Sequence, residues 1–317
     1  MSRLHAGQQL DSVTVWLRLP ATYGYFGGGN TGAYTLKTDR ITFSTGIVAA
    51  NTASNMSLAR YEPGGASDIV NYGYFAGGFS SAYISSTDRI TFSTGANAVN
   101  TVSNISSARY SLVGISDGST YGYFAGGNSL SYVVTADRIT FSNGATAAST
   151  VSNLSQGRGY LAGASDKSTY GYFAGGNSGT GVATTDRITF STSVTAANTA
   201  SNISVARSDD TGISDNQSIY GYFLGGYSST YTKITDRITF ATSVTAANTA
   251  SDLSGNRYEA MGISDGSLYG YSAGGDSGAK VTTTDRIVFA TSVTSVNTAS
   301  VLSVAKCGGA GVSDMAV

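Results

Sequence analysis

The chain has 317 residues and a formal net charge of −1, and only 12% of its residues are charged, so no basic field points to a nucleic-acid partner. Its single cysteine, Cys307, excludes an internal disulfide, and no apolar run approaches the ~20 residues of a membrane-spanning helix. Residues 1–20 lack the uninterrupted apolar stretch and the cleavage site of a signal peptide. We therefore expect no nucleic-acid partner and no membrane insertion.

The first predicted element is residues 12–19, SVTVWLRL, in which apolar and polar residues alternate as in a half-buried strand. It precedes every repeat described below, so we interpret residues 1–20 as an N-terminal extension. The extension packs across its own chain, stays disordered, or docks on a neighbouring subunit by strand addition. The candidate assembly residues are Val13, Val15, Trp16, Leu17 and Leu19.

Residues 21–317 consist of six repeats of about 49 residues. The sequence DRI[TV]F recurs at Asp39, Asp88, Asp137, Asp186, Asp236 and Asp285, and Gly-x-Ser-Asp ends at Asp68, Asp117, Asp166, Asp215, Asp265 and Asp314. The third repeat contains four predicted strands, residues 109–117, 120–127, 135–142 and 149–155. Four strands per repeat indicate a six-bladed β-propeller. A β-solenoid is the main alternative, but its rungs are usually shorter.

The second strand of each repeat carries the motif YGYFAGG or a close variant of it. Tyr121 and Tyr123 face one side of this strand and Phe124 the other, as expected of a blade covered on both faces. The glycine pair at its end allows a positive φ and a turn into the third strand. One glycine also recurs in each first strand, which suits the innermost strand because a Cβ would crowd the axis. These glycines are Gly65, Gly114, Gly163, Gly212, Gly262 and Gly311.

The segments YGYFAGG, DRITFS and NISSAR together resemble a kelch repeat, with its Gly-Gly pair, its aromatic third strand and its arginine. The resemblance covers residues 21–317 and implies a kelch-like propeller that binds partners through its loops. Two features depart from the family: small residues such as Ala148 stand near the usual tryptophan, and Phe141 and its equivalents replace a tyrosine. The repeats are also similar to Gly/Tyr-rich propeller repeats of phage or environmental surface proteins.

The repeats begin at a second strand, residues 22–29, and end with an extra first strand, residues 306–314. We therefore expect the C-terminal strand to pair with the N-terminal blade and close the ring. Trp16 is too large for the glycine position of an innermost strand, which leaves residues 1–20 outside the ring.

We predict no catalytic, cofactor or metal site. The only histidine, His5, lies outside the ring, and most carboxylates recur in every repeat, so no reactive group breaks the repeat symmetry. Calcium binding through aspartates and backbone carbonyls stays open, although no Asp-x-Asp-x-Asp-Gly loop is present. The two aspartate series are expected to pair with two basic series within or between blades. The basic series are Arg40, Arg89, Arg138, Arg187, Arg237 and Arg286, and Arg60, Arg109, Arg158, Arg207, Arg257 and Lys306.

Differences between repeats concentrate after the glycine pair and after the arginine, in the second-to-third and fourth-to-first connections. Both open on one face of the disc, which we call the variable face. All tyrosines outside Tyr-Gly-Tyr fall there, and Tyr, Ser, Asn and Gly are typical of adaptable binding surfaces. The alternative is that they only pack the loops. They are Tyr34, Tyr61, Tyr83, Tyr110, Tyr132, Tyr160, Tyr227, Tyr231 and Tyr258.

We predict a non-enzymatic structural and binding module of an extracellular or virion assembly, such as a surface filament or a phage appendage. Its expected partners are copies of itself and a glycan or surface protein. The alternative is a carbohydrate-binding lectin that stacks sugars on the tyrosines. An intracellular kelch-type adaptor is a third class, but no accompanying recruitment domain is present.

Overall fold

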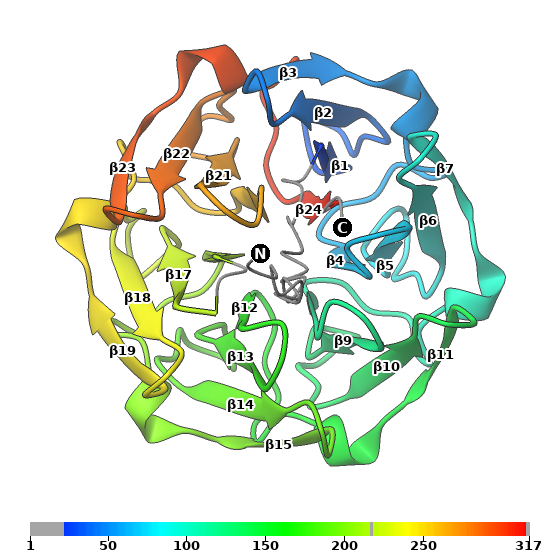
Figure 1. Cartoon of the computed structure of the whole chain (residues 1–317). Helices are drawn as coiled ribbons and strands as arrows, with labels where there is room; N and C mark the ends of the chain where they lie inside the picture. The colour runs from blue at the N-terminus through cyan, green and yellow to red at the C-terminus, as the bar shows by residue number, and fades with distance from the viewer. Residues whose placement is uncertain (1–21, 216–217, 315–317) are drawn as a thin grey trace, which may run out of the picture.

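Each repeat of the sequence contributes to a four-stranded antiparallel sheet, and the six sheets stand around a common axis (Figure 1). The computed structural model describes residues 22–215 and 218–314. Within these ranges the only helical elements are six short 3₁₀ turns. The expected six-bladed β-propeller with four strands per blade is therefore confirmed.

Each blade has four strands that follow one another from the axis outward. The innermost strands are β24 (Ala310–Ser313), β4 (Gly64–Ser67), β8 (Val113–Ser116), β12 (Ala162–Ser165), β16 (Thr211–Ser214) and β20 (Met261–Ser264). The second strands are β1 (Tyr23–Gly27), β5 (Tyr72–Ala76), β9 (Tyr121–Ala125), β13 (Tyr170–Ala174), β17 (Tyr220–Leu224) and β21 (Tyr269–Ala273).

The third strands are β2 (Thr38–Thr42), β6 (Thr87–Thr91), β10 (Ala136–Thr140), β14 (Thr185–Thr189), β18 (Thr235–Thr239) and β22 (Thr284–Val288). The outer strands are β3 (Ile47–Ala50), β7 (Ala96–Val99), β11 (Ala145–Ala148), β15 (Val194–Ala197), β19 (Val244–Ala247) and β23 (Val293–Val296). The 3₁₀ turns are η1 (Thr52–Ser54), η2 (Thr101–Ser103), η3 (Thr150–Ser152), η4 (Thr199–Ser201), η5 (Thr249–Ser251) and η6 (Thr298–Ser300).

The predicted fourth strand was wrong. It was expected at residues 149–155, but the outer strand is β11, and residues 150–152 form η3. The chain turns immediately after β10, where the Gly144 amide donates to the Thr140 carbonyl at 2.8 Å and Gly144 has φ +70°. This tight turn brings the small residues of β11 into register with β10 and leaves the following segment as the connection to the next blade.

Ring closure follows the expectation. The last strand, β24, pairs antiparallel with β1, with Phe26 opposite Gly311. The Asp314 side chain fixes the junction, because its Oδ1 accepts the amides of Thr22 at 2.6 Å and Tyr23 at 2.8 Å. The innermost strand of the first blade therefore comes from the C-terminal end of the chain, and no exposed inner edge remains.

Tyrosine and phenylalanine from successive blades interlock to form the core. Tyr123 of β9 and Phe173 of β13 belong to one buried cluster, and the Tyr123 ring stacks on Phe190 with centroids 5.9 Å apart. Their alternation along the second strand gives five of the six blades one aromatic residue for each neighbour, as the motif predicts, whereas β21 carries Ser272 in place of the phenylalanine. Two neighbouring blades thus share each core cluster.

The glycines occupy the positions where a side chain does not fit. A Cβ on Gly65 would lie 2.5 Å from the carbonyl oxygen of Gly311 on the neighbouring blade. At the strand end, Gly126 and Gly127 have φ values of +66° and +106°, and the other five pairs repeat this geometry. Both glycine predictions are confirmed.

Only half of the expected ion pairs form. One series links consecutive blades and is fully buried, as in Arg109–Asp137 at 2.7 Å, and the chain closes it with Lys306–Asp39 at 3.1 Å. The other aspartates instead accept backbone amides in the first-to-second turns, as Asp117 does from Thr120 and Tyr121. The other arginines lie over the first tyrosine of Tyr-Gly-Tyr, at 4.2–4.4 Å from the ring centroid. For that half the pairing prediction was wrong.

Candidate functional site

The two variable connections of neighbouring repeats adjoin on one face, as expected. Asn128, in a second-to-third connection, forms β-bridges both to Tyr132 of the same connection and to Tyr110 of a fourth-to-first connection. The same double bridge recurs at Phe79, which contacts Tyr61 and Tyr83. The variable segments thus form one continuous loop layer rather than separate loops.

The nine candidate tyrosines form two clusters on this face. One arc runs over successive blades and includes Phe79, which the sequence analysis missed because it considered tyrosines alone. The other cluster lies where Tyr231 and Tyr258 stack at 5.1 Å. The arc comprises Tyr34, Tyr61, Phe79, Tyr83, Tyr110, Tyr160 and Tyr132, and the second cluster Tyr227, Tyr231 and Tyr258.

Most of these rings are partly buried by one another. Only Tyr34, at 40% exposure, and Tyr227, at 42%, present a large part of the ring to solvent. The tyrosines therefore pack the loop layer, and each cluster offers one open ring. An aromatic ring with one free face can accept an apolar or sugar surface.

A closed ring of backbone hydrogen bonds surrounds the axis at the variable face. It runs through the residue two positions after the conserved Arg or Lys of each blade, and each amide donates to the carbonyl of the preceding blade at 2.7–3.0 Å. All six residues have φ between +50° and +61°. In order around the axis they are Glu62, Ser111, Tyr160, Asp209, Glu259 and Gly308.

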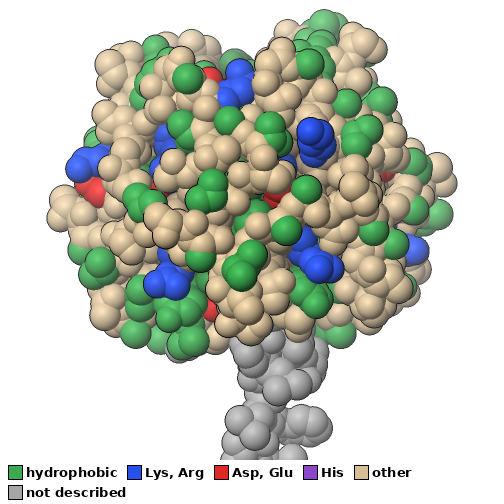
Figure 2. Space-filling view, turned by 90° about the horizontal axis from the view of Figure 1, so that it is seen from above, with side chains coloured by type: hydrophobic (Ala, Val, Ile, Leu, Met, Phe, Trp, Pro, Cys, Tyr) green, Lys and Arg blue, Asp and Glu red, His purple; other side chains and the backbone are tan. Residues whose placement is uncertain are grey.

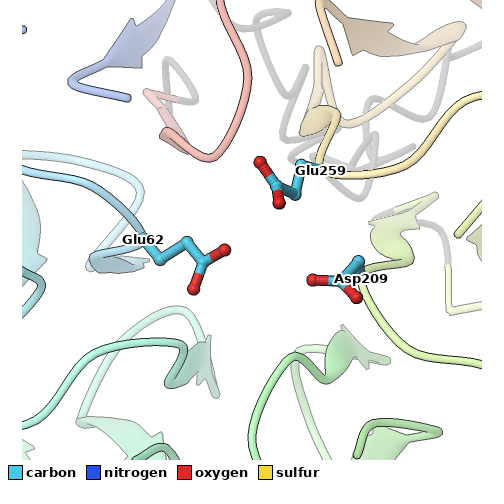
Figure 3. Close-up of side chains that lie close together, drawn as sticks. All are labelled: Glu62, Asp209 and Glu259. Atoms are coloured by element: carbon cyan, nitrogen blue, oxygen red, sulfur yellow. The ribbon is translucent and has the colours of Figure 1, made fainter. Parts of the chain in front are cut away.

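Three of these six positions carry acids, and their carboxyl groups turn towards the axis (Figure 3). One carboxylate oxygen from each of Glu62, Asp209 and Glu259 lies within 4.8 Å of the other two. Glu62 and Glu259 are the only glutamates in the chain. We call Glu62, Asp209 and Glu259 the axial acidic cluster.

Hydrogen bonds hold one side of each carboxylate. Tyr61 Oη donates to Glu259 Oε1 at 2.5 Å, Ser208 Oγ donates to Asp209 Oδ2 at 2.6 Å, and Ser111 Oγ donates to Glu62 Oε2. Glu62 Oε1 and Glu259 Oε2 are buried and have no hydrogen-bond partner among the described residues. The oxygens left without a partner belong to the groups that face the axis.

Burial and mutual repulsion disfavour the charged forms of these acids. Burial, together with Glu259 and Asp209, raises the pKa of Glu62 well above its usual value. Burial also raises the pKa of Asp209 to about 7, despite the hydrogen bond from Ser208, and raises the pKa of Glu259. Such groups either share protons or neutralise a bound cation.

The cluster lies over a cavity of about 140 Å³ on the axis. Its described lining contains no Lys, Arg or His, and it includes a fourth acid, Asp210, which is 7% exposed and stands where other blades place Leu112 and Leu161. Neither oxygen of Asp210 has a hydrogen-bond partner among the described residues, although Arg207 Nε lies 3.8 Å away. The described lining is thus acidic without a basic residue.

The opposite end of the axis has different chemistry. A second cavity of about 110 Å³ lies beyond the axial glycines, lined by serines and by one cation, Lys167. Lys167 Nζ donates to Ser116 Oγ at 3.2 Å, and burial lowers the pKa of Lys167 to about 8. The two ends of the axis therefore differ in the sign of their charge.

The structure overturns one statement of the sequence analysis, that no reactive group breaks the repeat symmetry. The cluster residues come from the variable segments YEPG, SDDT and YEAM, at the same offset from the conserved basic residue. That shared offset, combined with a closed ring, was the signal that could have revealed the cluster. The candidate assembly residues Val13, Val15, Trp16, Leu17 and Leu19 lie outside the described residues.

Charged side chains elsewhere are sparse. In the view of Figure 2, basic and acidic groups are few and scattered, and no large patch of either sign is visible on this face. Among the described residues, no helix is long and apolar enough to cross a membrane. No family model matches the chain, and neither does any curated protein. The kelch resemblance therefore rests on the repeat pattern alone.

Proposed function

We propose that this chain is a kelch-like, non-enzymatic binding and structural module of an extracellular or virion assembly. It recognises a partner through the variable face and associates with copies of itself through residues 13–19. The supporting observation is the division of the molecule: ring-forming residues repeat in every blade, whereas differences gather on one face that carries both aromatic clusters.

The physical support is that a repeat protein needs only its repeated residues to fold. Gly-Gly turns, axial glycines and buried ion pairs are satisfied in every blade. The residues that differ between blades are not needed for folding and can contact a partner. Aromatic rings suit this because they lose little conformational entropy on binding. Tyr34 and Tyr227 are the side chains we expect to anchor a partner, because they are the most exposed rings of their clusters.

Self-association is tested by comparing the full chain with a variant lacking residues 1–20 in light scattering. Because the ring closes between residues 22 and 314, this deletion leaves the ring contacts in place. We expect the full chain to form oligomers or filaments and the shortened chain to be monomeric. An unchanged mass refutes the assembly role, and electron microscopy of native material shows the form of the assembly.

A lectin is the second candidate, favoured by two separated open rings that suit multivalent sugar stacking. A glycan array should give hits that disappear in Tyr34→Ala and Tyr227→Ala. The matched control is Leu268→Ala, since Leu268 is 57% exposed in a first-to-second connection on the opposite face. Hits that survive both tyrosine changes would exclude these rings as the sugar site.

The non-enzymatic part needs its own test, because paired carboxylates are the groups that glycosidases use. Purified protein should show no turnover of a panel of chromogenic glycosides. Turnover that disappears in Glu62→Gln or Glu259→Gln would refute it and identify the cluster as a catalytic site.

A further inference from the structure

The axial acidic cluster has a feature that the binding role does not explain. Glu62 is 8% exposed, and its Oε1 has neither a hydrogen bond nor a basic partner among the described residues. An unpaired, buried carboxylate oxygen is costly unless a cation or proton satisfies it. Figure 3 shows this carboxyl group turned towards those of Asp209 and Glu259.

The spacing and the number of the carboxylates suit one shared cation. Their oxygens lie within 4.8 Å of one another. Oxygens on opposite sides of Ca²⁺, at about 2.3–2.6 Å from the ion, stand up to about 5 Å apart, so the three carboxylates can share one ion. Mg²⁺ is usually held by one or two carboxylates and keeps several waters, so a set of three carboxylates favours Ca²⁺. All ligands are oxygens, and the cluster contains neither the imidazole nor the thiolate that zinc prefers.

The surroundings suit a small hard cation. No basic residue stands among the described residues of the cavity wall, and the buried Asp210, whose Oδ2 lies 3.8 Å from Arg207 Nε, also lines the cavity. The backbone ring fixes the three main-chain positions, because each amide and carbonyl of that ring is hydrogen-bonded to the next blade. A fixed main chain with converging acidic side chains reduces the ordering needed on binding.

From this geometry we propose that Glu62, Asp209 and Glu259 form a Ca²⁺-binding site on the propeller axis. Each residue supplies at least one carboxylate oxygen, and water completes the coordination shell. Because the three ligands come from three different blades, the bound ion ties the blades together at the variable face. The site does not depend on the identity of any partner of that face.

The test uses the full chain, freed of metal with a chelator and titrated with CaCl₂ by calorimetry at neutral pH. We expect one Ca²⁺ per chain with a dissociation constant below about 1 mM, and weaker binding of Mg²⁺. Tb³⁺ provides a spectroscopic probe, because Tyr61 donates to Glu259 and can sensitise terbium luminescence when its ring is excited. Added Ca²⁺ should displace this signal.

Amide variants identify the ligands. Glu62→Gln and Glu259→Gln should each weaken Ca²⁺ binding at least about tenfold and remove the rise in melting temperature that Ca²⁺ produces in the wild type. The matched control is Asp252→Asn, because other blades carry Asn55, Asn104, Asn153 and Asn202 at that position. This control should bind Ca²⁺ as the wild type does.

Without metal, the same amide variants should melt no lower than the wild type, since they remove like-charge repulsion at the axis. That measurement separates ligand loss from misfolding. Absence of saturable Ca²⁺ binding up to about 1 mM, equal binding in Glu62→Gln, or a preference for Mg²⁺ would overturn the proposal.

Discussion

The ion pairs between blades make a quantitative prediction at Arg109. Arg109 Nη2 lies 2.7 Å from Asp137 Oδ2, and both side chains are fully buried. The same guanidinium donates to the carbonyls of Gly126 at 2.8 Å and Phe124 at 3.1 Å. Arg109→Met therefore leaves a buried carboxylate and two carbonyls without their donor.

Removing one partner of a buried ion pair costs about 3–5 kcal/mol, which is a large fraction of a typical folding free energy of about 5–15 kcal/mol. The double variant Arg109→Met/Asp137→Asn removes the unpaired charge and keeps an oxygen that can accept the Ser106 amide, now 3.0 Å from Asp137 Oδ1. We expect it to be more stable than the single variant by about 1–3 kcal/mol.

The assay is guanidinium unfolding followed by far-ultraviolet circular dichroism, with the midpoint shift read at an unchanged slope. Lys37→Met serves as the control because Lys37 is exposed, and it should change stability by less than about 0.5 kcal/mol. A cost below about 1 kcal/mol for Arg109→Met, or a double variant no more stable than the single one, would refute the view that these pairs lock neighbouring blades.

Three further changes probe the ring. Gly144→Ser should be about 1 kcal/mol more stable than Gly144→Ala. Both variants keep the positive φ, but only the serine hydroxyl can pair with the buried Tyr74 hydroxyl, which has no hydrogen-bond partner among the described residues. Equal melting temperatures would contradict this. Gly114→Ala should cost more than about 2 kcal/mol, since its Cβ meets the Gly65 backbone, and near-neutral stability would contradict that packing. Burial lowers the pKa of Lys167 to about 8, so below pH 8 its buried charge destabilises the folded protein, and this cost is lost as the pH rises from 8 to 10.5. Relative to Lys167→Met, the wild type should therefore gain about 1–2 kcal/mol of stability between pH 7 and pH 10 in paired denaturation curves. A difference that does not depend on pH would contradict the shift.

The repeated residues made the fold predictable. Tyr123 and Phe124 alternate over a strand buried on both sides, Gly126 and Gly127 take the positive φ values expected of the turn, and the C-terminal strand closes the ring. The tyrosine and the glycine pair recur in all six repeats and the phenylalanine in five, so the period reveals them without knowledge of contacts. The sequence pattern was sufficient wherever the structural requirement concerned residues close together in one repeat.

The outer strand and half of the charge pairs were not predictable in this way. The outer strand β11 is ATAA, too short and too weakly patterned to compete with the β-branched segment that follows it. Arg138 and Asp117 are as regular as Arg109 and Asp137, so period alone cannot tell a cation over a tyrosine ring from an ion pair. Only the cross-strand register distinguishes the two.

The axial acidic cluster is a departure from the repeat that the fold itself does not explain. Gly308 occupies the same backbone ring as Glu62 and donates the same hydrogen bond without any side chain, so the fold does not require acids there. Placing three carboxylates on one axis adds desolvation and repulsion that Ser111 and Tyr160 avoid at equivalent positions. Since the backbone ring forms equally well with neutral residues, the cost of these acids is offset either by protons that they share or by the bound cation that we propose, and the Ca²⁺ titration separates the two.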